Sequence, residues 1–208
     1  MRLLVLGATG GTGMEIVRQA SEQGHTVTAL VRSPERLSKP AHQISIVQGD
    51  LLDEHQLTRV LEGQDAVLSA FGPRVPVSKA DAHLLKQFAV TLTAAMKRSG
   101  VRRILFVSVA FLFKNAVFPP AYVLGRLLFP KIVADAAAAE SVIQASALDW
   151  TIVRPPELTD KPYTGKYRVR SGHLPVFGLS ISRADVADFI LKTADEPSTI
   201  GNIYGISN

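Results

Sequence analysis

The segment GATGGTG, residues 7–13, is the feature that most restricts how this sequence of 208 residues can fold. It directly follows the apolar run at residues 3–6, which is typical of a short buried strand, and it precedes a helical pattern. Glycine permits positive φ angles and lets a ligand approach the main chain, so this cluster suits a dinucleotide pyrophosphate. The alternative is a purely structural tight turn, which does not need three glycines at this spacing. We therefore expect a dinucleotide site here.

The three glycines of the G-x-x-G-x-x-G spacing have separate expected roles, although the common fingerprint is G-x-G-x-x-G and its turn differs by one residue. Gly7 turns the chain away from the strand, Gly10 admits the pyrophosphate, and Gly13 lets helix and strand pack closely. Threonine hydroxyls add donors to the free main-chain amides at the start of the helix. The predicted pyrophosphate site comprises Gly7, Thr9, Gly10, Gly11, Thr12 and Gly13.

The residues after the second expected strand, 26–31, predict which form of the cofactor is bound. NAD-preferring sites usually place a carboxylate here for the ribose hydroxyls, whereas this sequence has Arg32. A guanidinium matches a ribose 2′-phosphate through a charge-assisted, forked contact. With Ser33 as a hydroxyl donor and Arg36 a turn later, the sequence favours NADP(H) over NAD(H). In the alternative interpretation Arg36 pairs with Glu35 or lies in solvent.

Two further turns follow the third and fourth expected strands, at the sheet edge where open α/β sheets bind ligands. Asp50 is expected to accept from the adenine amino group while Leu51 packs on the ring; alternatively Asp50 caps the next helix. In the second turn Phe71 and Gly72 are expected beside the cofactor, with Gly72 giving it room. Arg74 either reaches a phosphate or lies in solvent.

The order of the expected elements predicts an α/β fold with a doubly wound, Rossmann-type parallel sheet and helices on both faces. Short β-branched apolar runs alternate with longer helical patterns. Strands are expected at residues 3–6, 26–31, 44–47, 66–69, 104–108, 151–153 and 201–204, and helices include 79–98, 132–145 and 185–194. No repeat or linker interrupts the chain, so residues 1–208 are expected to form one NAD(P)-binding domain.

Composition and charge argue against several other classes of protein. The formal net charge is +5, but the basic residues are scattered apart from residues 97–103, where a helix end is expected, so we expect no nucleic-acid partner. Residues 111–130 are apolar but broken by prolines and charges, so no membrane span is expected. The five histidines lack ligand spacing, which predicts no metal site. The absence of cysteine and of a secretory leader predicts a cytoplasmic protein.

Seven segments together resemble the atypical short-chain dehydrogenases, and among them the biliverdin-IXβ reductase/flavin reductase-like and NmrA-like proteins. These segments are GATGGTG, LVRSPERL, QGD, GQDAVLSAFG, VAFLF, RPPELTDKPYTGKY and ISRADVADF, which span residues 7–189 in this order. The resemblance implies use of NADPH to reduce flavins or linear tetrapyrroles at an open, aromatic-lined site. It also places Ser108, Pro155 and Pro156 along the cofactor.

The sequence departs from these families at positions that bear on catalysis. Val109 stands where a serine is frequent, and Glu157 stands where a histidine commonly follows the paired prolines. The usual Tyr-x-x-x-Lys couple is absent because Arg126 follows Tyr122 at the lysine position, and arginine does not serve as a proton relay. Alcohol oxidation is therefore disfavoured, whereas hydride transfer to a flavin needs mainly stacking and orientation.

The candidate catalytic residues are Ser108, which would position the nicotinamide or the acceptor, and Glu157, which would relay a proton. Alternatively Ser108 caps a strand end and Glu157 lies in solvent. The loops at residues 109–130 and 154–180 are expected to form the acceptor site, rimmed by Tyr163, Tyr167, His173 and Phe177.

The sequence leaves three functional hypotheses, of which an NADPH-dependent reductase of a flavin, tetrapyrrole or quinone-like acceptor is favoured. A non-catalytic NADP(H)-sensing protein is the first alternative, because the catalytic tyrosine and lysine are missing. An epimerase or dehydratase-like enzyme is the second, and the short segment after residue 153 leaves little room for a large substrate domain. The protein is expected to be a monomer or a homodimer.

Overall fold

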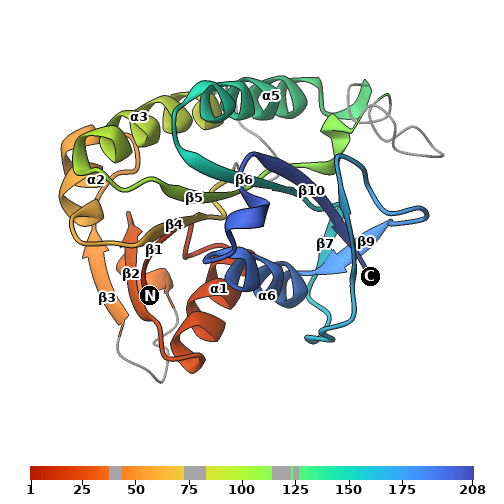
Figure 1. Ribbon diagram of the computed structural model, residues 1–208, viewed down its shortest axis with the longest axis horizontal. Helices are drawn as coiled ribbons and strands as arrows, with labels where there is room; N and C mark the ends of the chain where they lie inside the picture. Colours follow the sequence, from red (N-terminus) through yellow and green to blue (C-terminus); the bar gives the residue numbers. More distant parts are fainter. Residues whose placement is uncertain (38–43, 73–82, 114–122, 124–126) are drawn as a thin grey trace.

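The computed structural model describes residues 1–37, 44–72, 83–113, 123 and 127–208. Its main feature is a twisted sheet that runs through the molecule between two layers of helices (Figure 1). The strands are β1 (Arg2–Leu6), β2 (Thr26–Val31), β3 (Ile44–Gln48), β4 (Ala66–Ser69), β5 (Arg103–Val107), β6 (Asp149–Arg154), β8 (Arg168–Ser171) and β10 (Asn202–Ser207). They lie in the order β3-β2-β1-β4-β5-β6-β10-β8, and only the pairing of β8 with β10 is antiparallel. The expected doubly wound Rossmann-type α/β fold is confirmed.

The helices cover both faces of this sheet because its central strands are apolar on both sides. Leu3 and Val5 of β1 pack with α1 (Gly11–Glu22) and α6 (Arg183–Thr193). Leu4 and Leu6 pack on the opposite face, which is covered by α2 (Glu54–Leu61), α3 (Leu84–Ser99) and α5 (Pro130–Ala145) (Figure 1). Among the described residues, short 3₁₀ turns join these elements: η1 (Pro34–Arg36), η3 (Ala110–Leu112) and η4 (Pro197–Thr199).

The start of α3 is where the sequence-based expectation was wrong. A helix was expected from residue 79, and residues 79–82 lie outside the described residues. The described helix α3 begins at Leu84, directly after His83, whose φ of 67° is a left-handed conformation that a continuous helix cannot include. The first turn is capped from another helix: the Leu85 and Lys86 amides donate to the carboxylate of Asp135 on α5, at 2.9 and 3.1 Å. The far end agrees with expectation, since Gly100 terminates the helix with φ 78°.

The segment after β6 contains three strands that the sequence did not predict. One is β8, whose four residues are all exposed, so it lacks the apolar alternation by which a strand is recognised. The others, β7 (Glu157–Thr159) and β9 (Ser180–Ser182), form a separate two-stranded parallel sheet. This small sheet leads directly into α6, so the first residue of α6 lies beside the start of α1.

Candidate functional site

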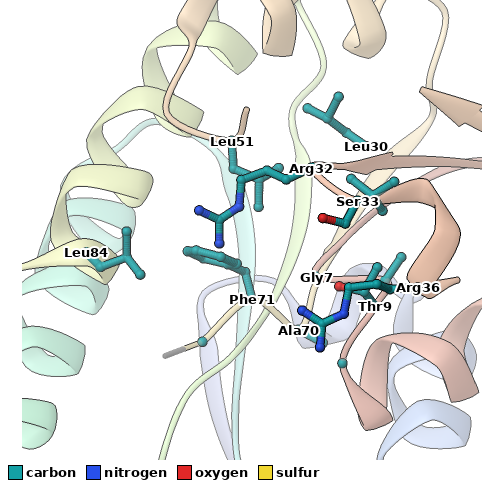
Figure 2. Close-up of a pocket in the computed structure, with 14 residues that line it drawn as sticks. Gly7, Thr9, Leu30, Arg32, Ser33, Arg36, Leu51, Ala70, Phe71 and Leu84 are labelled. Atoms are coloured by element: carbon teal, nitrogen blue, oxygen red, sulfur yellow. The ribbon is translucent and has the colours of Figure 1, made fainter. Parts of the chain in front are cut away.

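A cavity of about 440 Å³ opens at the carboxyl edge of the large sheet, beside the point where the chain crosses from β3 to β4. This strand order makes β1 and β4 the topological switch of the sheet, the place where doubly wound folds bind their ligands. The turns after β1, β2, β3 and β4 all contribute to the wall (Figure 2). The lining residues are Gly7, Ala8, Thr9, Gly10, Leu30, Val31, Arg32, Ser33, Arg36, Leu51, Ala70, Phe71, Gly72 and Leu84.

The glycine turn has the close backbone packing that a pyrophosphate site requires. Gly7 has φ 81°, and a Cβ on it would lie 2.7 Å from main-chain atoms of Ala70 and Phe71. A Cβ on Gly13 would lie 2.1 Å from the carbonyl oxygen of Gly7, so the first turn of α1 rests directly on the end of β1. No side chain caps α1, and its first turn holds no acidic residue, which leaves its amides suited to an anion. These residues fit a dinucleotide.

The other predicted members of this turn divide into two groups. Thr9 and Gly10 line the cavity, and the Gly10 amide donates to the Gly7 carbonyl at 3.0 Å, which closes the turn. Gly11 and Thr12 lie in the first turn of α1 and do not line the cavity; Thr12 is buried, and Gly11 packs against the side chain of Arg183.

Arg32, Ser33 and Arg36 all line the cavity, after β2. Figure 2 shows the Arg32 side chain extending toward Phe71, while that of Arg36 extends toward Ala70 beside the glycine turn. In the described part of the chain neither guanidinium forms an ion pair, with Glu35 or any other carboxylate. Two uncompensated cations therefore face one side of the cavity.

The third and fourth turns place some of the predicted residues on the wall and leave others away from it. Leu51 lines the cavity, but Asp50 is exposed, does not line it, and accepts from the Leu52 amide at 3.0 Å. The idea that Asp50 caps the following helix is wrong, because Asp53 caps α2 through the amides of residues 55 and 56.

After β4, Phe71 and Gly72 line the cavity. The Phe71 ring is held from behind by Phe88 of α3, with ring centroids 4.7 Å apart, and a Cβ at Gly72 would meet nothing within 4 Å. Arg74 lies outside the described residues.

Ser108 follows β5 at the same edge of the sheet and does not line the cavity. Its amide donates to the Val153 carbonyl at 2.8 Å, but its Oγ atom is buried and has no hydrogen-bond partner among the described residues. Ser69, which the sequence analysis missed, ends β4 in the same state, with a fully buried and unpartnered Oγ. Its position at a strand end was the available signal. Buried hydroxyls without partners are uncommon, so both positions stand out at this edge of the sheet.

Pro155, Pro156 and Glu157 follow β6 and do not line the cavity. The Pro155 carbonyl accepts from the Ala110 amide at 3.0 Å, which ties this segment to the end of β5. Glu157 is exposed on β7, which agrees with the alternative interpretation that this side chain lies in solvent.

Several acidic residues that could suggest catalysis hold the fold together instead. Glu140 is buried and pairs with Arg154 at 2.5 Å, while Asp135 caps α3. Among the residues expected around the acceptor, Tyr163 and Tyr167 donate to Asp188 at 3.3 and 2.6 Å. Burial, and then the bond to Asp188, raise the pKa of Tyr167, so its hydroxyl keeps its proton.

The other two residues expected around the acceptor site lie apart from this network. Phe177 is 79% exposed, with φ 57°, and His173 is exposed. Within the described ranges no three His, Asp or Glu residues are grouped as metal ligands, and no described helix is long and apolar enough to cross a bilayer.

Comparison with known proteins identifies the class of this site. The family described as NAD(P)H-binding matches residues 7–197, nearly the whole chain and all of the cavity wall. The chain belongs to this family. The predicted use of a nicotinamide dinucleotide is therefore confirmed, whereas the residues that hold it and the preference for NADP(H) stay predictions.

Three curated relatives show the range of this family. An uncharacterized chloroplastic protein of Arabidopsis thaliana is 32% identical over 201 residues, covering 92% of this chain and 71% of that protein. The photosystem II assembly factor Ycf39 of Synechocystis sp. is 37% identical over 113 residues, covering 52% and 34%. A (4-alkanoyl-5-oxo-2,5-dihydrofuran-3-yl)methyl phosphate reductase of Streptomyces griseus is 30% identical over 154 residues, covering 74% and 46%. The matches span less than half the length of the last two proteins.

Solved structures give the same picture. A Rossmann-fold NAD(P)-binding protein from Shigella flexneri is 28% identical, with TM-score 0.78, covering 100% of this chain and 93% of its own. Two others, whose lower identity shows the fold alone, also cover all of this chain. They are a short-chain dehydrogenase/reductase from Veillonella parvula in complex with NADP (18%, TM-score 0.83, 94% of that chain) and the anaerobilin reductase ChuY from Escherichia coli O157:H7 (22%, 0.81, 97%). The NAD(P)H-binding family and the Rossmann fold are confirmed. A short-chain dehydrogenase/reductase, the group that the sequence resembles, is among the structural neighbours, and a reductase is among the relatives.

Proposed function

We propose that this protein is an NADPH-dependent reductase whose acceptor is a flat aromatic molecule of the flavin, tetrapyrrole or quinone kind. The observation that carries the proposal is that the guanidinium groups of Arg32 and Arg36, which form no ion pair within the described residues, lie on one wall of a cavity that also contains the glycine turn. A carboxylate at this position would serve a free ribose, whereas two cations and the Ser33 hydroxyl suit a ribose phosphate.

Each part of the dinucleotide has a partner on this edge of the sheet. Arg32, Ser33 and Arg36 would hold the 2′-phosphate, Leu51 would pack on the adenine, and the amides at the start of α1 would bind the pyrophosphate. The nicotinamide ring supplies a hydride when the cofactor is bound. The unpartnered hydroxyl of Ser108 would orient this end of the cofactor or the acceptor.

The positions at which related enzymes carry a proton donor indicate the type of acceptor. Alcohol and ketone chemistry needs a general acid, but Arg126 replaces the usual lysine, and Glu157, the candidate proton donor, is exposed away from the cavity. An extended ring system that takes its proton from solvent makes no such demand. The structural neighbour ChuY is described as an anaerobilin reductase, which is compatible with this class of acceptor.

To test the proposal, the purified protein is mixed with NADPH and one acceptor at a time, either FMN, biliverdin or a quinone. Oxidation of NADPH is followed by absorbance at 340 nm. We expect the absorbance to fall with at least one acceptor, faster with NADPH than with NADH. Ser108→Ala should lower kcat with little change in the Kd of NADPH, because Ser108 does not line the cavity. A flat trace with every acceptor but tight NADPH binding would instead support the NADP(H)-sensing alternative.

Two further attributes belong to the same proposal. A chain without cysteine suits a reducing compartment, so we propose a cytoplasmic location. The loops at residues 109–130, of which 114–122 and 124–126 lie outside the described residues, and 154–180 are proposed to form the acceptor site, in a protein that is a monomer or a homodimer.

A further inference from the structure

Arg183, the first residue of α6, lies against the start of α1. A Cβ placed on Gly11 would be 2.6 Å from its Cδ atom and 2.8 Å from its Nε atom. The two helices pack together along the same face of the sheet, and Gln19 of α1 donates to the Ala184 carbonyl at 2.8 Å, which fixes their relative position. The Arg183 side chain is therefore held at the first turn of α1, beside the amides of the glycine turn.

The guanidinium of Arg183 has only a weak partner in the described part of the chain. Its Nη1 atom donates to Asp160 at 2.6 Å, and no other hydrogen bond from this side chain is formed there. Asp160 is 89% exposed, whereas the Arg183 side chain is 27% exposed. An ion pair with so exposed a carboxylate is screened by water and salt and contributes little. The remaining guanidinium donors are available to a ligand.

We infer that Arg183 is a further dinucleotide-binding residue, which exchanges the Asp160 carboxylate for an oxygen of the cofactor pyrophosphate. The inference rests on the proposed function, since it requires a dinucleotide whose pyrophosphate lies at the start of α1. A charge-assisted bond from guanidinium to phosphate is stronger than the exposed pair it replaces. Arg183 thus acts from the start of α6, whereas Arg32 and Arg36 come from the turn after β2.

The inference also explains Gly11, for which the three-glycine spacing gives no reason. A side chain at Gly11 would overlap the aliphatic part of Arg183 and displace its guanidinium from the turn. Gly11 therefore makes room for Arg183, while Gly7 and Gly13 let the main chain pack closely.

The test is calorimetric measurement of Kd, without any acceptor, for the natural sequence and two variants. The four ligands are NADPH, NADH, ADP-ribose, which has the pyrophosphate but no 2′-phosphate, and adenosine 2′-monophosphate, which has no pyrophosphate. We expect Arg183→Ala to weaken NADPH, NADH and ADP-ribose about tenfold each, and to leave adenosine 2′-monophosphate unchanged. Asp160→Asn removes the competing carboxylate from an exposed position, and it should lower the Kd values of NADPH, NADH and ADP-ribose by about two- to fivefold.

A matched control is Arg2→Ala, which removes one charge and one exposed ion pair, with Asp65, at the other end of β1. The strand is about 16 Å long, beyond the range of unscreened charge at physiological salt, so this variant should bind like the natural protein. Arg183→Lys should recover part of the lost affinity, which a purely structural role would not explain.

Four outcomes would overturn the inference. In Arg183→Ala, these outcomes are an unchanged affinity for NADPH and ADP-ribose, weaker binding of NADPH but not of NADH or ADP-ribose, or a raised KM for the acceptor with an unchanged Kd for NADPH. In Asp160→Asn, the outcome is an unchanged Kd for NADPH, NADH and ADP-ribose. Absence of binding of any dinucleotide to the natural sequence would instead contradict the proposed function itself. Because Asp160 is exposed, its variant remains informative even if Arg183→Ala does not fold.

Discussion

Replacing Gly13 by alanine tests the closest packing in the glycine turn. The added Cβ would lie 2.1 Å from the Gly7 carbonyl oxygen and 2.8 Å from the Ala8 Cα atom, so main-chain atoms must move by more than about 1 Å. Overpacking of this kind costs about 1–3 kcal/mol, and a rigid backbone neighbour places this site at the top of the range. Alanine recovers about 1 kcal/mol through its higher helix propensity. The net loss is therefore about 2 kcal/mol in the free energy of unfolding.

For a chain of this length that loss lowers Tm by about 4–8 °C, which thermal unfolding followed by circular dichroism can measure without cofactor. The control is Gly10→Ser at the N-cap of the same helix. Gly10 has φ −88° and ψ 158°, no side chain caps α1, and a Cβ there would be 3.3 Å from the Gly7 oxygen. Serine is a preferred N-cap, so stability should be kept or rise slightly, while its hydroxyl should weaken NADPH at least tenfold by occupying the amides. Gly13→Ala with an unchanged Tm would refute the close-packing argument.

Three further predictions concern charge. Arg32→Ala should weaken NADPH about tenfold or more in a fluorescence titration and NADH hardly at all, and equal losses would mean that Arg32 does not bind the 2′-phosphate. Glu140→Ala leaves Arg154 nearly buried without its carboxylate and should lower the free energy of unfolding by about 3–5 kcal/mol in urea, whereas a loss below about 1 kcal/mol would show that the pair is dispensable. Burial opposes the charge of Asp185, but hydrogen bonds from Asn208, Thr164 and Gly165 hold the pKa of this carboxyl below its ordinary value. The stabilisation from this carboxylate is therefore present above the ordinary pKa and is lost as pH falls through the lower folded-state pKa. Asp185→Asn should be less stable near neutral pH and should show a smaller further loss in acid, measured by urea unfolding at several pH values, and an unchanged acid profile would contradict this role.

The local sequence pattern was sufficient to predict the central strands and the glycine turn. The apolar runs gave the central strands because both faces of these strands are buried, and the glycine spacing gave the turn because Gly7 and Gly13 have no room for a Cβ. Local pattern failed for β8, where all four side chains are exposed and pairing with β10 alone defines the strand. It also failed for the start of α3, where the cap is a carboxylate 50 residues away.

The site residues likewise divide into those that local sequence predicts and those that depend on packing between distant segments. Residues next to strand ends, such as Arg32 and Phe71, were found because position along a parallel strand determines position at the sheet edge. Arg183 was missed because its contact with Gly11 depends on how α6 packs on α1, which no local pattern describes. Ser69 was missed although it ends a predicted strand, since only the structure reveals that its hydroxyl has no partner in the described part of the chain.

The cap that Asp135 gives to α3 has a consequence for the order of folding. Leu84 lines the cavity, and the amide of the next residue, Leu85, is one of the two that Asp135 binds. During synthesis the first four strands and the glycine turn leave the ribosome long before α5 does, so this wall of the cavity stays unfinished in the nascent chain. The cofactor can therefore report on maturation, since a fragment lacking α5 would retain the turn yet hold the nucleotide poorly.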